Sequence, residues 1–318
     1  MISMAERHYH IIFNGSAGTI ATSGLTPEAL SLHFETAGLS FTIDSDESIE
    51  LADRIASALA GPADTIVAAG GDGTVLAVAE ALLGTDKTLC VLPLGTFNGL
   101  ARDLRLPLDL TAAVAALPTL VPRSIDVGEV NGRPFLHNVL VGMIPGIAVG
   151  REYIRHKVGI LAHLGFIRFM VRRLTRTRRI ALGIESDDKP VHVERLQTLM
   201  VANNSYEQRV GSFMTRRRID RGTLTFYIIR TLRVRDAVRL AVEMLAGRWR
   251  DDEVIEFEAV KTLTLHSKRH RLPVTMDGEI LSLEPPLRFT VLPRSLSVLA
   301  PPDPVEAVLA EVEPVEAT

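Results

Sequence analysis

The chain has 318 residues, 47% of them hydrophobic, which is enough for one large or two ordinary domains with buried cores. No uninterrupted run of 18 apolar residues, no recognisable signal peptide and a single cysteine, Cys90, argue against a transmembrane, secreted or disulfide-linked protein and predict a cytoplasmic one. The net charge of −3 is unevenly spread, because five acidic residues and no Lys or Arg follow Pro301.

Strand-like and helix-like stretches alternate along the first 125 residues. Strands are predicted at 9–15, 40–43, 65–69 and 88–93, and helices at 27–37, 48–59, 75–83 and 99–104. Thr26 stands at the expected N-cap of the first helix. This alternation predicts an α/β domain in which helices cover both faces of a parallel sheet.

The pattern changes near residue 125. Residues 124–142 predict two strands around an Asn131-Gly132 hairpin turn, and one helix is predicted at 235–245. Further strands are predicted at 196–204, 223–230, 261–267 and 287–293. We therefore expect an antiparallel β-sandwich as the second domain. The predicted domains are 8–125, with 292–300 as a candidate addition, and 126–291, followed by a disordered acidic tail at 301–318.

Three glycine-containing turns follow predicted strands of the first domain, at 13–19 ("FNGSAGT"), 70–74 ("GGDGT") and 93–104 ("PLGTFNGLARDL"). In an open parallel sheet such turns lie at the carboxyl ends of the strands, where backbone N–H groups can bind phosphate. One such turn alone can be a purely structural connection, whereas three in one domain favour a phosphate site. None matches the dinucleotide fingerprint or the P-loop, which disfavours a Rossmann dehydrogenase and a P-loop ATPase.

Three blocks in order resemble the catalytic family of diacylglycerol kinases, which includes bacterial lipid kinases, sphingosine kinases and ceramide kinases. They are "GGDGT", "PLGTFNGLAR" and the stretch 272–301 with its "DGE", and the resemblance runs from about residue 9 to 301. It implies a Rossmann-like nucleotide-binding domain, similar to NAD kinases and phosphofructokinases, joined to a β-sandwich domain. It also implies that ATP, with Mg²⁺, binds in the cleft between them and that a lipid hydroxyl is phosphorylated.

The resemblance assigns roles to individual residues. Nucleotide-binding roles fall on Asn14, Gly18, Gly70, Gly71, Gly73, Thr74, Gly95, Thr96 and Asn98. Glu279 matches the family's proposed general base, and Asp72 and Asp277 would orient Mg²⁺ through water or position that base. Departures from the family pattern leave the metal ligands unassigned: no lysine follows Gly18, and Gly15, Gly99 and Arg221 replace a proline and two aspartates.

Two interpretations of Asp277-Gly278-Glu279 remain open. On a strand, where side chains alternate with a period of two, both carboxylates would point to the same face. The alternative is an Asp-Gly hairpin turn with two solvated acids.

Polar residues of the second domain match acceptor-site positions of the family. Asp126, Asn138 and Asn203 are the substrate-binding candidates, and Asn204 follows directly. The alternative for each is a hydrogen bond within a turn or at a strand end.

A basic, amphipathic segment at 158–179 is a candidate contact with an anionic membrane surface. Its apolar stripe comprises Ile160, Leu164, Ile167, Val171 and Leu174, and its C-terminal half carries six arginines. Each arginine near such a surface contributes on the order of 1 kcal/mol. The alternative is a core-packed helix; no nucleic-acid motif accompanies the arginines, so we expect no nucleic-acid partner. We expect peripheral association with the inner face of the membrane.

The sequence therefore predicts an ATP-dependent lipid kinase, most simply one that converts diacylglycerol to phosphatidic acid. Alternatives are the same chemistry on ceramide, a sphingoid base or phosphatidylglycerol, or a catalytically weak, nucleotide-dependent lipid-binding regulator. NAD kinase would fit "GGDG" alone, but the "PLGTFN" block disfavours it. An edge strand of the second domain could mediate a homodimer.

Overall fold

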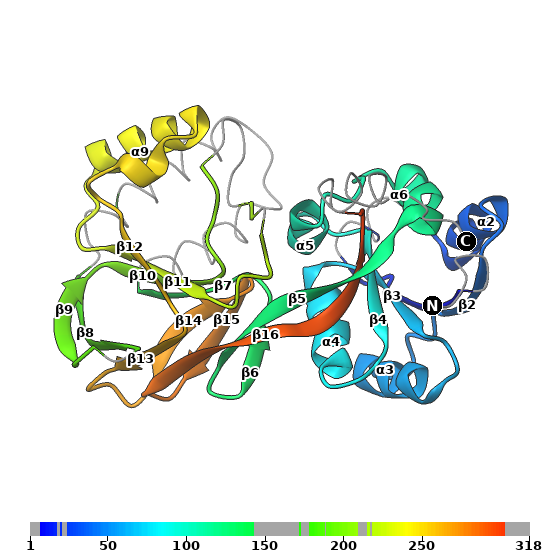
Figure 1. Cartoon of the computed structure of the whole chain (residues 1–318), viewed down its shortest axis with the longest axis horizontal. Coiled ribbons are helices and arrows are strands. Elements are labelled where there is room, and N and C mark those ends of the chain that lie inside the picture. Colours follow the sequence, from blue (N-terminus) through cyan, green and yellow to red (C-terminus); the bar gives the residue numbers. More distant parts are fainter. Residues whose placement is uncertain are drawn as a thin grey trace, which may run out of the picture. The chain divides into compact units, whose positions relative to one another are not determined.

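A computed structural model describes residues 7–17, 20, 24–142, 172, 178–187, 189–208, 215–216 and 218–302. The chain forms two compact units, the first from 1–125 with 295–318 and the second from 126–294. Strands β5 (Val121–Val130) and β16 (Leu287–Ala300) each run from one unit into the other (Figure 1). Within the described residues no helix combines the length and apolarity needed to cross a membrane.

The first unit is built on a parallel sheet in the order β2-β1-β3-β4, with the end of β16 beside β4. The bounds are β1 (His8–Phe13), β2 (Ser40–Asp44), β3 (Thr65–Gly70) and β4 (Thr88–Pro93). Every residue of β3 is buried, as its apolar, β-branched sequence predicts for a central strand covered on both faces. The predicted parallel α/β domain is thus confirmed.

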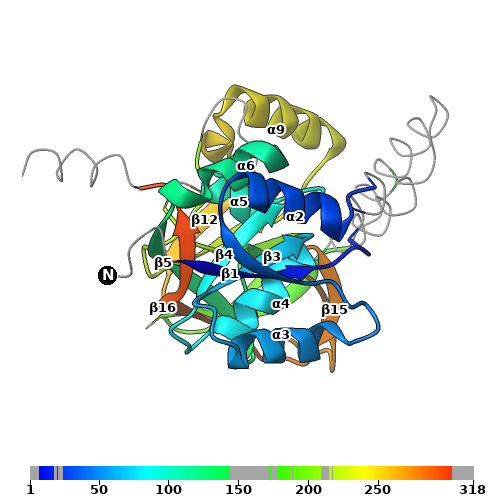
Figure 2. The same cartoon turned by 90° about the vertical axis from the view of Figure 1, so that its right-hand side faces the viewer.

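Helices cover both faces of this sheet (Figure 2). Helices α3 (Leu51–Ala60) and α4 (Asp72–Leu82) contact each other on one face, and α2 (Pro27–Thr36) contacts α6 (Leu110–Ala116) on the other. The short helix α5 (Gly99–Asp103) contacts β4, and a 3₁₀ turn, η2 (Leu117–Thr119), follows α6. Thr26 caps α2 as predicted, because its Oγ1 accepts a hydrogen bond from Ala29 N at 3.3 Å.

The second unit contains two antiparallel layers. One is a six-stranded sheet in the order β12-β11-β10-β7-β14-β15, and the other continues from β16 through β13 and β8 to β9, with β5 and β6 beside it. The bounds are β6 (Arg133–Phe135), β7 (Asn138–Gly142), β8 (Ile180–Ser186), β9 (His192–Leu196), β10 (Thr198–Asn203), β11 (Leu224–Ile229), β12 (Glu256–Val260), β13 (Thr262–His266), β14 (Leu272–Met276) and β15 (Glu279–Leu283).

One core joins the two layers of the second unit. Val141 and Val274 from the six-stranded sheet pack in the same buried cluster as Leu182, Leu263 and Phe289 from the other. Interdigitated inner faces of this kind define a β-sandwich, so the predicted fold of this domain is confirmed.

The helix α9 (Val234–Ala246) covers part of the six-stranded sheet, and a 3₁₀ turn, η3 (Trp249–Asp251), follows it (Figure 1). Leu240 of α9 packs with Tyr227 and Trp249 in a second cluster. The left-handed Gly247 ends the helix, with φ 70°.

The predicted hairpin at Asn131-Gly132 forms, but the long strand expected after it does not. The chain pairs with β5 only over β6, and then β7 pairs with β10 and β14 of the other sheet. Backbone N–H groups of Leu136, His137 and Asn138 at this switch point bond to a side chain instead of to a strand. The elements absent from the prediction are the strands β8, β9, β12, β14 and β15 and the helix α6.

The thiol of Cys90 is completely buried in β4, and burial raises its pKa to about 12. Thiol reagents attack the thiolate, which is scarce at mildly alkaline pH when the pKa is so high. We expect the native protein not to react with a chromogenic disulfide reagent, and unfolding in guanidinium to release one reactive thiol per chain. Fast stoichiometric labelling of the native protein would show that β4 opens locally.

Candidate functional site

The first turn is tied to the strand and helix beside it through Asn14, which directly follows β1. Its backbone N–H donates to Ala69 O of β3 at 3.0 Å, and its Nδ2 donates to Thr74 Oγ1 of α4 at 2.8 Å. Ser16 Oγ donates to Asn14 Oδ1 at 2.6 Å. Asn14 and Thr74, both predicted nucleotide-binding residues, therefore contact each other; Gly18 lies outside the described residues.

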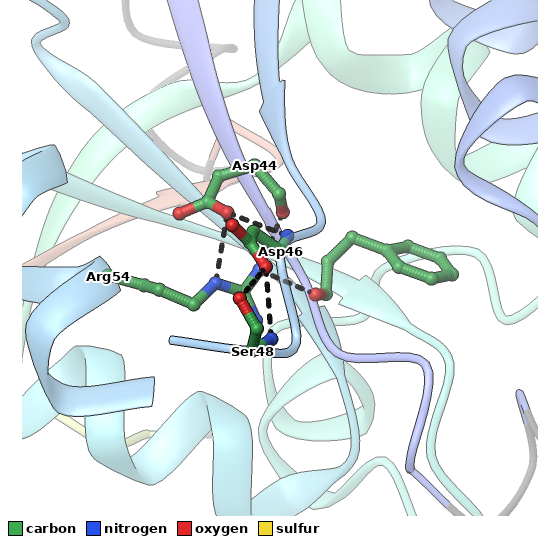
Figure 3. Close-up of polar contacts among 5 residues, drawn as sticks. Asp44, Asp46, Ser48 and Arg54 are labelled. Carbon is green, nitrogen blue, oxygen red and sulfur yellow. Dashed lines mark hydrogen bonds and ion pairs between the residues drawn. The ribbon is translucent and has the colours of Figure 1, made fainter. Parts of the chain in front are cut away.

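A buried arginine, Arg54, binds the last carbonyl group of β1. The sequence analysis did not identify this residue. Arg54 of α3 donates to Phe13 O at 2.8 Å and to Asp44 Oδ1 at 3.0 Å (Figure 3). Asp44 and Asp46 organise the next turn, where Asp46 Oδ1 accepts a bond from Ser48 N at 3.0 Å. These contacts explain why α3 begins at Leu51 and not at the predicted residue 48.

The second and third turns are joined through Asp72, the first residue of α4. Its Oδ1 accepts a hydrogen bond from Gly99 N at 2.8 Å, and its Oδ2 accepts one from Asn98 N at 3.1 Å. The carboxylate thus bonds to the backbone that opens α5. Its predicted catalytic role stays a prediction, but the structure adds a positioning role.

The third turn is closed by Asn98, which adopts a left-handed conformation with φ 52°. Its Oδ1 accepts a bond from Gly95 N at 2.7 Å, and its Nδ2 donates to Pro93 O at 3.2 Å. Thr96 lies exposed on the same turn.

Glycine is required where the turns approach one another. A Cβ on Gly70 would lie 2.5 Å from Thr74 Oγ1, and one on Gly95 would lie 3.0 Å from Gly71 Cα. By contrast, a Cβ on Gly71 would meet nothing nearer than Ala17 Cβ, at 3.8 Å. No capping side chain at Gly71 accepts a hydrogen bond from the first N–H groups of α4. This cradle fits a phosphate group, with Gly73 in the same helical turn.

The Asp277-Gly278 pair forms a turn, and the expectation of a common strand is wrong. Both residues have positive φ, 46° and 95°, and they connect β14 to β15 as Asp-Gly pairs in hairpins do. The Asp277 carboxylate is not solvated either, because it accepts bonds from Leu136 N at 2.6 Å and from His137 N and Asn138 N at 2.9 Å each. Glu279 opens β15 with an exposed side chain.

Asp126 and Asn203 lie in a buried hydrogen-bond network of the second unit. Asp126 is completely buried, and its carboxylate accepts bonds from Gly222 N at 2.5 Å, Arg294 N at 2.8 Å and Asn204 Nδ2 at 3.1 Å. Asn203 Nδ2 donates to Asp126 O at 2.8 Å. Any part that these side chains play in substrate binding is therefore indirect and stays a prediction.

Arg216 completes this network, although its sequence neighbours suggest a basic surface. It is buried, and its Nη1 donates to Asn203 O at 2.6 Å and to Leu136 O at 2.7 Å. Its Nη2 bonds to His137 Nδ1 at 2.8 Å, and Asn138 Nδ2 donates to Tyr206 Oη at 2.7 Å. Asp126, Asn138, Asn203 and Asp277 are thus brought together around residues 136–138; nothing in the sequence separates Arg216 from the arginines after it.

Within the described residues, no three His, Cys, Asp or Glu side chains converge as a metal cage. Mg²⁺ in phosphate-transferring sites is held mainly by water, phosphate and one or two carboxylates, so such a cage is not required. The predicted membrane segment 158–179 lies outside the described residues except for Arg172, Arg178 and Arg179, which are exposed.

Comparisons with known proteins agree with this architecture. The model of the diacylglycerol kinase catalytic domain matches residues 8–130, and that of the YegS C-terminal NAD kinase beta sandwich-like domain matches 148–300. A Pseudomonas aeruginosa (strain PAO1) protein named "Probable lipid kinase YegS-like" is 32% identical over 251 residues, covering 78% of this chain and 80% of that protein. A Bacillus subtilis (strain 168) protein named diacylglycerol kinase is 28% identical over 250 residues, covering 76% and 80%.

A solved structure shows the same fold. A crystal structure described as that of a diacylglycerol kinase from Bacillus anthracis str. Sterne has a TM-score of 0.62 at 19% identity, and covers 93% of this chain and 97% of that chain. The two family matches together span both units, and the resemblance drawn from "GGDGT", "PLGTFNGLAR" and "DGE" is confirmed. The chain therefore belongs to the diacylglycerol kinase catalytic-domain family and is a kinase.

Proposed function

We propose that this enzyme transfers the γ-phosphoryl group of ATP to a hydroxyl of a membrane lipid, with diacylglycerol as the first candidate acceptor. The observation that carries the proposal is that Asn14 joins the first glycine-containing turn to the second and Asp72 joins the second to the third, at the start of α4. The names of the relatives, which include lipid kinase and diacylglycerol kinase, favour a lipid acceptor.

In this proposal the chain's residues bind, align and move one proton. The N–H groups at the start of α4 hold phosphate oxygens, and Asp72 fixes the third turn against them. Glu279, on the exposed end of β15, accepts the proton of the attacking hydroxyl. When bound, MgATP supplies the phosphoryl group and a metal charge that balances the phosphate oxygens.

The central experiment incubates the enzyme with γ-labelled ATP, Mg²⁺ and a total lipid extract in mixed micelles, followed by chromatography of the lipids. We expect one labelled lipid, whose mobility identifies diacylglycerol, ceramide, a sphingoid base or phosphatidylglycerol as acceptor. Glu279→Gln should lower its formation by about 10²–10⁴-fold, because general base catalysis contributes that much.

Ile280 next to Glu279 is also exposed, so Ile280→Gln serves as a matched control that should keep wild-type turnover. ATP binding without any labelled lipid would favour a nucleotide-dependent lipid-binding regulator. Wild-type turnover in Glu279→Gln would remove Glu279 from the role of base.

Gly95→Ala tests the cradle without touching an ionisable group. The added Cβ would lie 2.9 Å from Asn98 Oδ1 and 3.0 Å from Gly71 Cα, so the second and third turns must separate. We expect kcat/KM for ATP to fall at least about tenfold, since small misplacements in an aligned site are costly. Gly84→Ala is the control, because its added Cβ would have no neighbouring atom within 4 Å. This variant should lose stability, since Gly84 has a φ of 76°, but it should keep the kcat/KM for ATP.

A further inference from the structure

The outer face of α9 exposes two large apolar side chains that no core requires. Val238 and Val242 are 61% and 60% exposed and lie one helical turn apart. Ala241 between them is exposed as well. The opposite side of the same helix is satisfied, because Leu240 and Met244 pack against the sheet below. Among the residues that the structure describes, none covers the apolar side chains of this outer face.

Three arginines of α9 and its two ends reach solvent, and one of them, Arg235, forms an ion pair with Asp236 at 3.4 Å. The side chain of Arg235 is 76% exposed, and Arg233 and Arg248 are exposed at the two ends of the helix. The acids of α9 are less accessible, with side-chain exposures of 13% for Asp236 and 27% for Glu243.

Arg239 starts on the outer face of α9, but its guanidinium forms an ion pair with Asp252, which follows the helix. Its Nη2 and Nε bind the two carboxylate oxygens of buried Asp252 at 2.7 and 3.0 Å. The outer face thus combines an apolar centre with a cationic margin.

We infer that the outer face of α9, defined as Arg235, Val238, Arg239, Ala241 and Val242, is a docking surface for an anionic lipid bilayer. A specific protein interface buries about 800 Å² and 20–30 residues on each partner, far more than one convex helix face with two valines offers. A helix lying in the bilayer interface needs only apolar side chains facing down and arginines that reach lipid phosphates. The inference deepens the proposed lipid-kinase function, and it concerns a segment distinct from 158–179.

The test measures co-sedimentation of the full chain with phosphatidylcholine vesicles that contain or lack phosphatidylglycerol. Val238→Asp/Val242→Asp should weaken binding to the anionic vesicles at least about tenfold, because two apolar contacts become two repelled charges. Arg235→Gln should weaken it about fivefold, and only on anionic vesicles. The matched control is Val191→Asp/Val193→Asp at β9, where the valines are 51% and 72% exposed; it should bind like wild type.

Activity separates this inference from the proposed function. With a short-chain acceptor in monomeric solution, the α9 double variant should keep wild-type turnover, whereas on vesicles its turnover should fall with its binding. Loss of vesicle binding in a chain that phosphorylates no lipid would support the docking surface and defeat the proposed function. Equal binding by wild type, α9 variant and control, no binding by wild type, or a changed oligomeric state without changed vesicle binding would each overturn the docking surface.

Discussion

Asp72→Ala is expected to lower kcat/KM for ATP by at least about a hundredfold, because it detaches the third turn from α4. In the wild type the two carboxylate oxygens accept bonds from Gly99 N and Asn98 N, which fixes both turns in one arrangement. Without the side chain, two half-buried N–H groups lose their acceptor, and we expect unfolding free energy to fall by about 1–3 kcal/mol. Steady-state kinetics and urea titration measure the two effects.

Asp64→Ala provides the matched control for Asp72. Asp64 is exposed just before β3, at the opposite end of the strand that leads to Gly71 and Asp72, so its loss should leave kinetics and stability near wild type. Asp72→Asn keeps the shape but places an NH₂ donor against one backbone N–H, and most of the loss should persist. Activity within twofold of wild type in Asp72→Ala would mean that the backbone bridge is not needed for turnover.

The α/β unit was predictable because its signals are local. Thr65–Gly70 is a short buried run that ends at a glycine turn, and Thr26 precedes a helix whose N–H it caps. The start of α3 was missed because the Asp46 carboxylate accepts a hydrogen bond from Ser48 N and so holds Ser48 in a turn before the helix, while the buried Arg54 bonds Asp44.

The second unit was predictable in class but not at its switch point. The sequence predicts one strand through residues 133–142, yet the chain leaves one sheet and enters the other at Leu136 to Asn138, where the Asp277 carboxylate binds the backbone. That partner comes from a turn some 140 residues later in the sequence, a long-range contact that no local pattern reports. Arg216 is similar, because only burial distinguishes it from a surface arginine.

The candidate site was predicted best where backbone geometry decides the residue type. Gly70 and Gly95 stand where a Cβ has no room, so the structural constraint is visible in the sequence as a glycine. Of the two interpretations of Asp277, the strand is wrong because its φ is 46°, which an extended strand does not allow. The Asp-Gly pair carried the correct signal for a turn.

Asp277→Ala is expected to lower kcat at least about a hundredfold, although its carboxylate is fully engaged with the backbone. Removing it leaves Leu136 N, His137 N and Asn138 N without their acceptor and frees the turn that leads into β15. Glu279, the proposed base, follows that turn after one glycine, so the backbone that carries it is no longer held in place. The free energy of unfolding should fall by about 2–4 kcal/mol, as measured by urea titration through the transition. The kcat is measured under conditions in which each variant is folded.

Asp187 offers a control with the same local chemistry. It too has a positive φ, 44°, and its Oδ1 accepts bonds from Lys261 N and Thr262 N at 2.9 Å each. Asp187→Ala should therefore lose stability for the same reason as Asp277→Ala, but it lies after β8, away from the turn into β15, and should keep kcat. If both variants lost kcat in proportion to their stability, Asp277 would matter only for folding. A loss of kcat in Asp277→Ala but not in Asp187→Ala would show that the hydrogen bonds from Asp277 to the backbone of residues 136–138 are needed for catalysis.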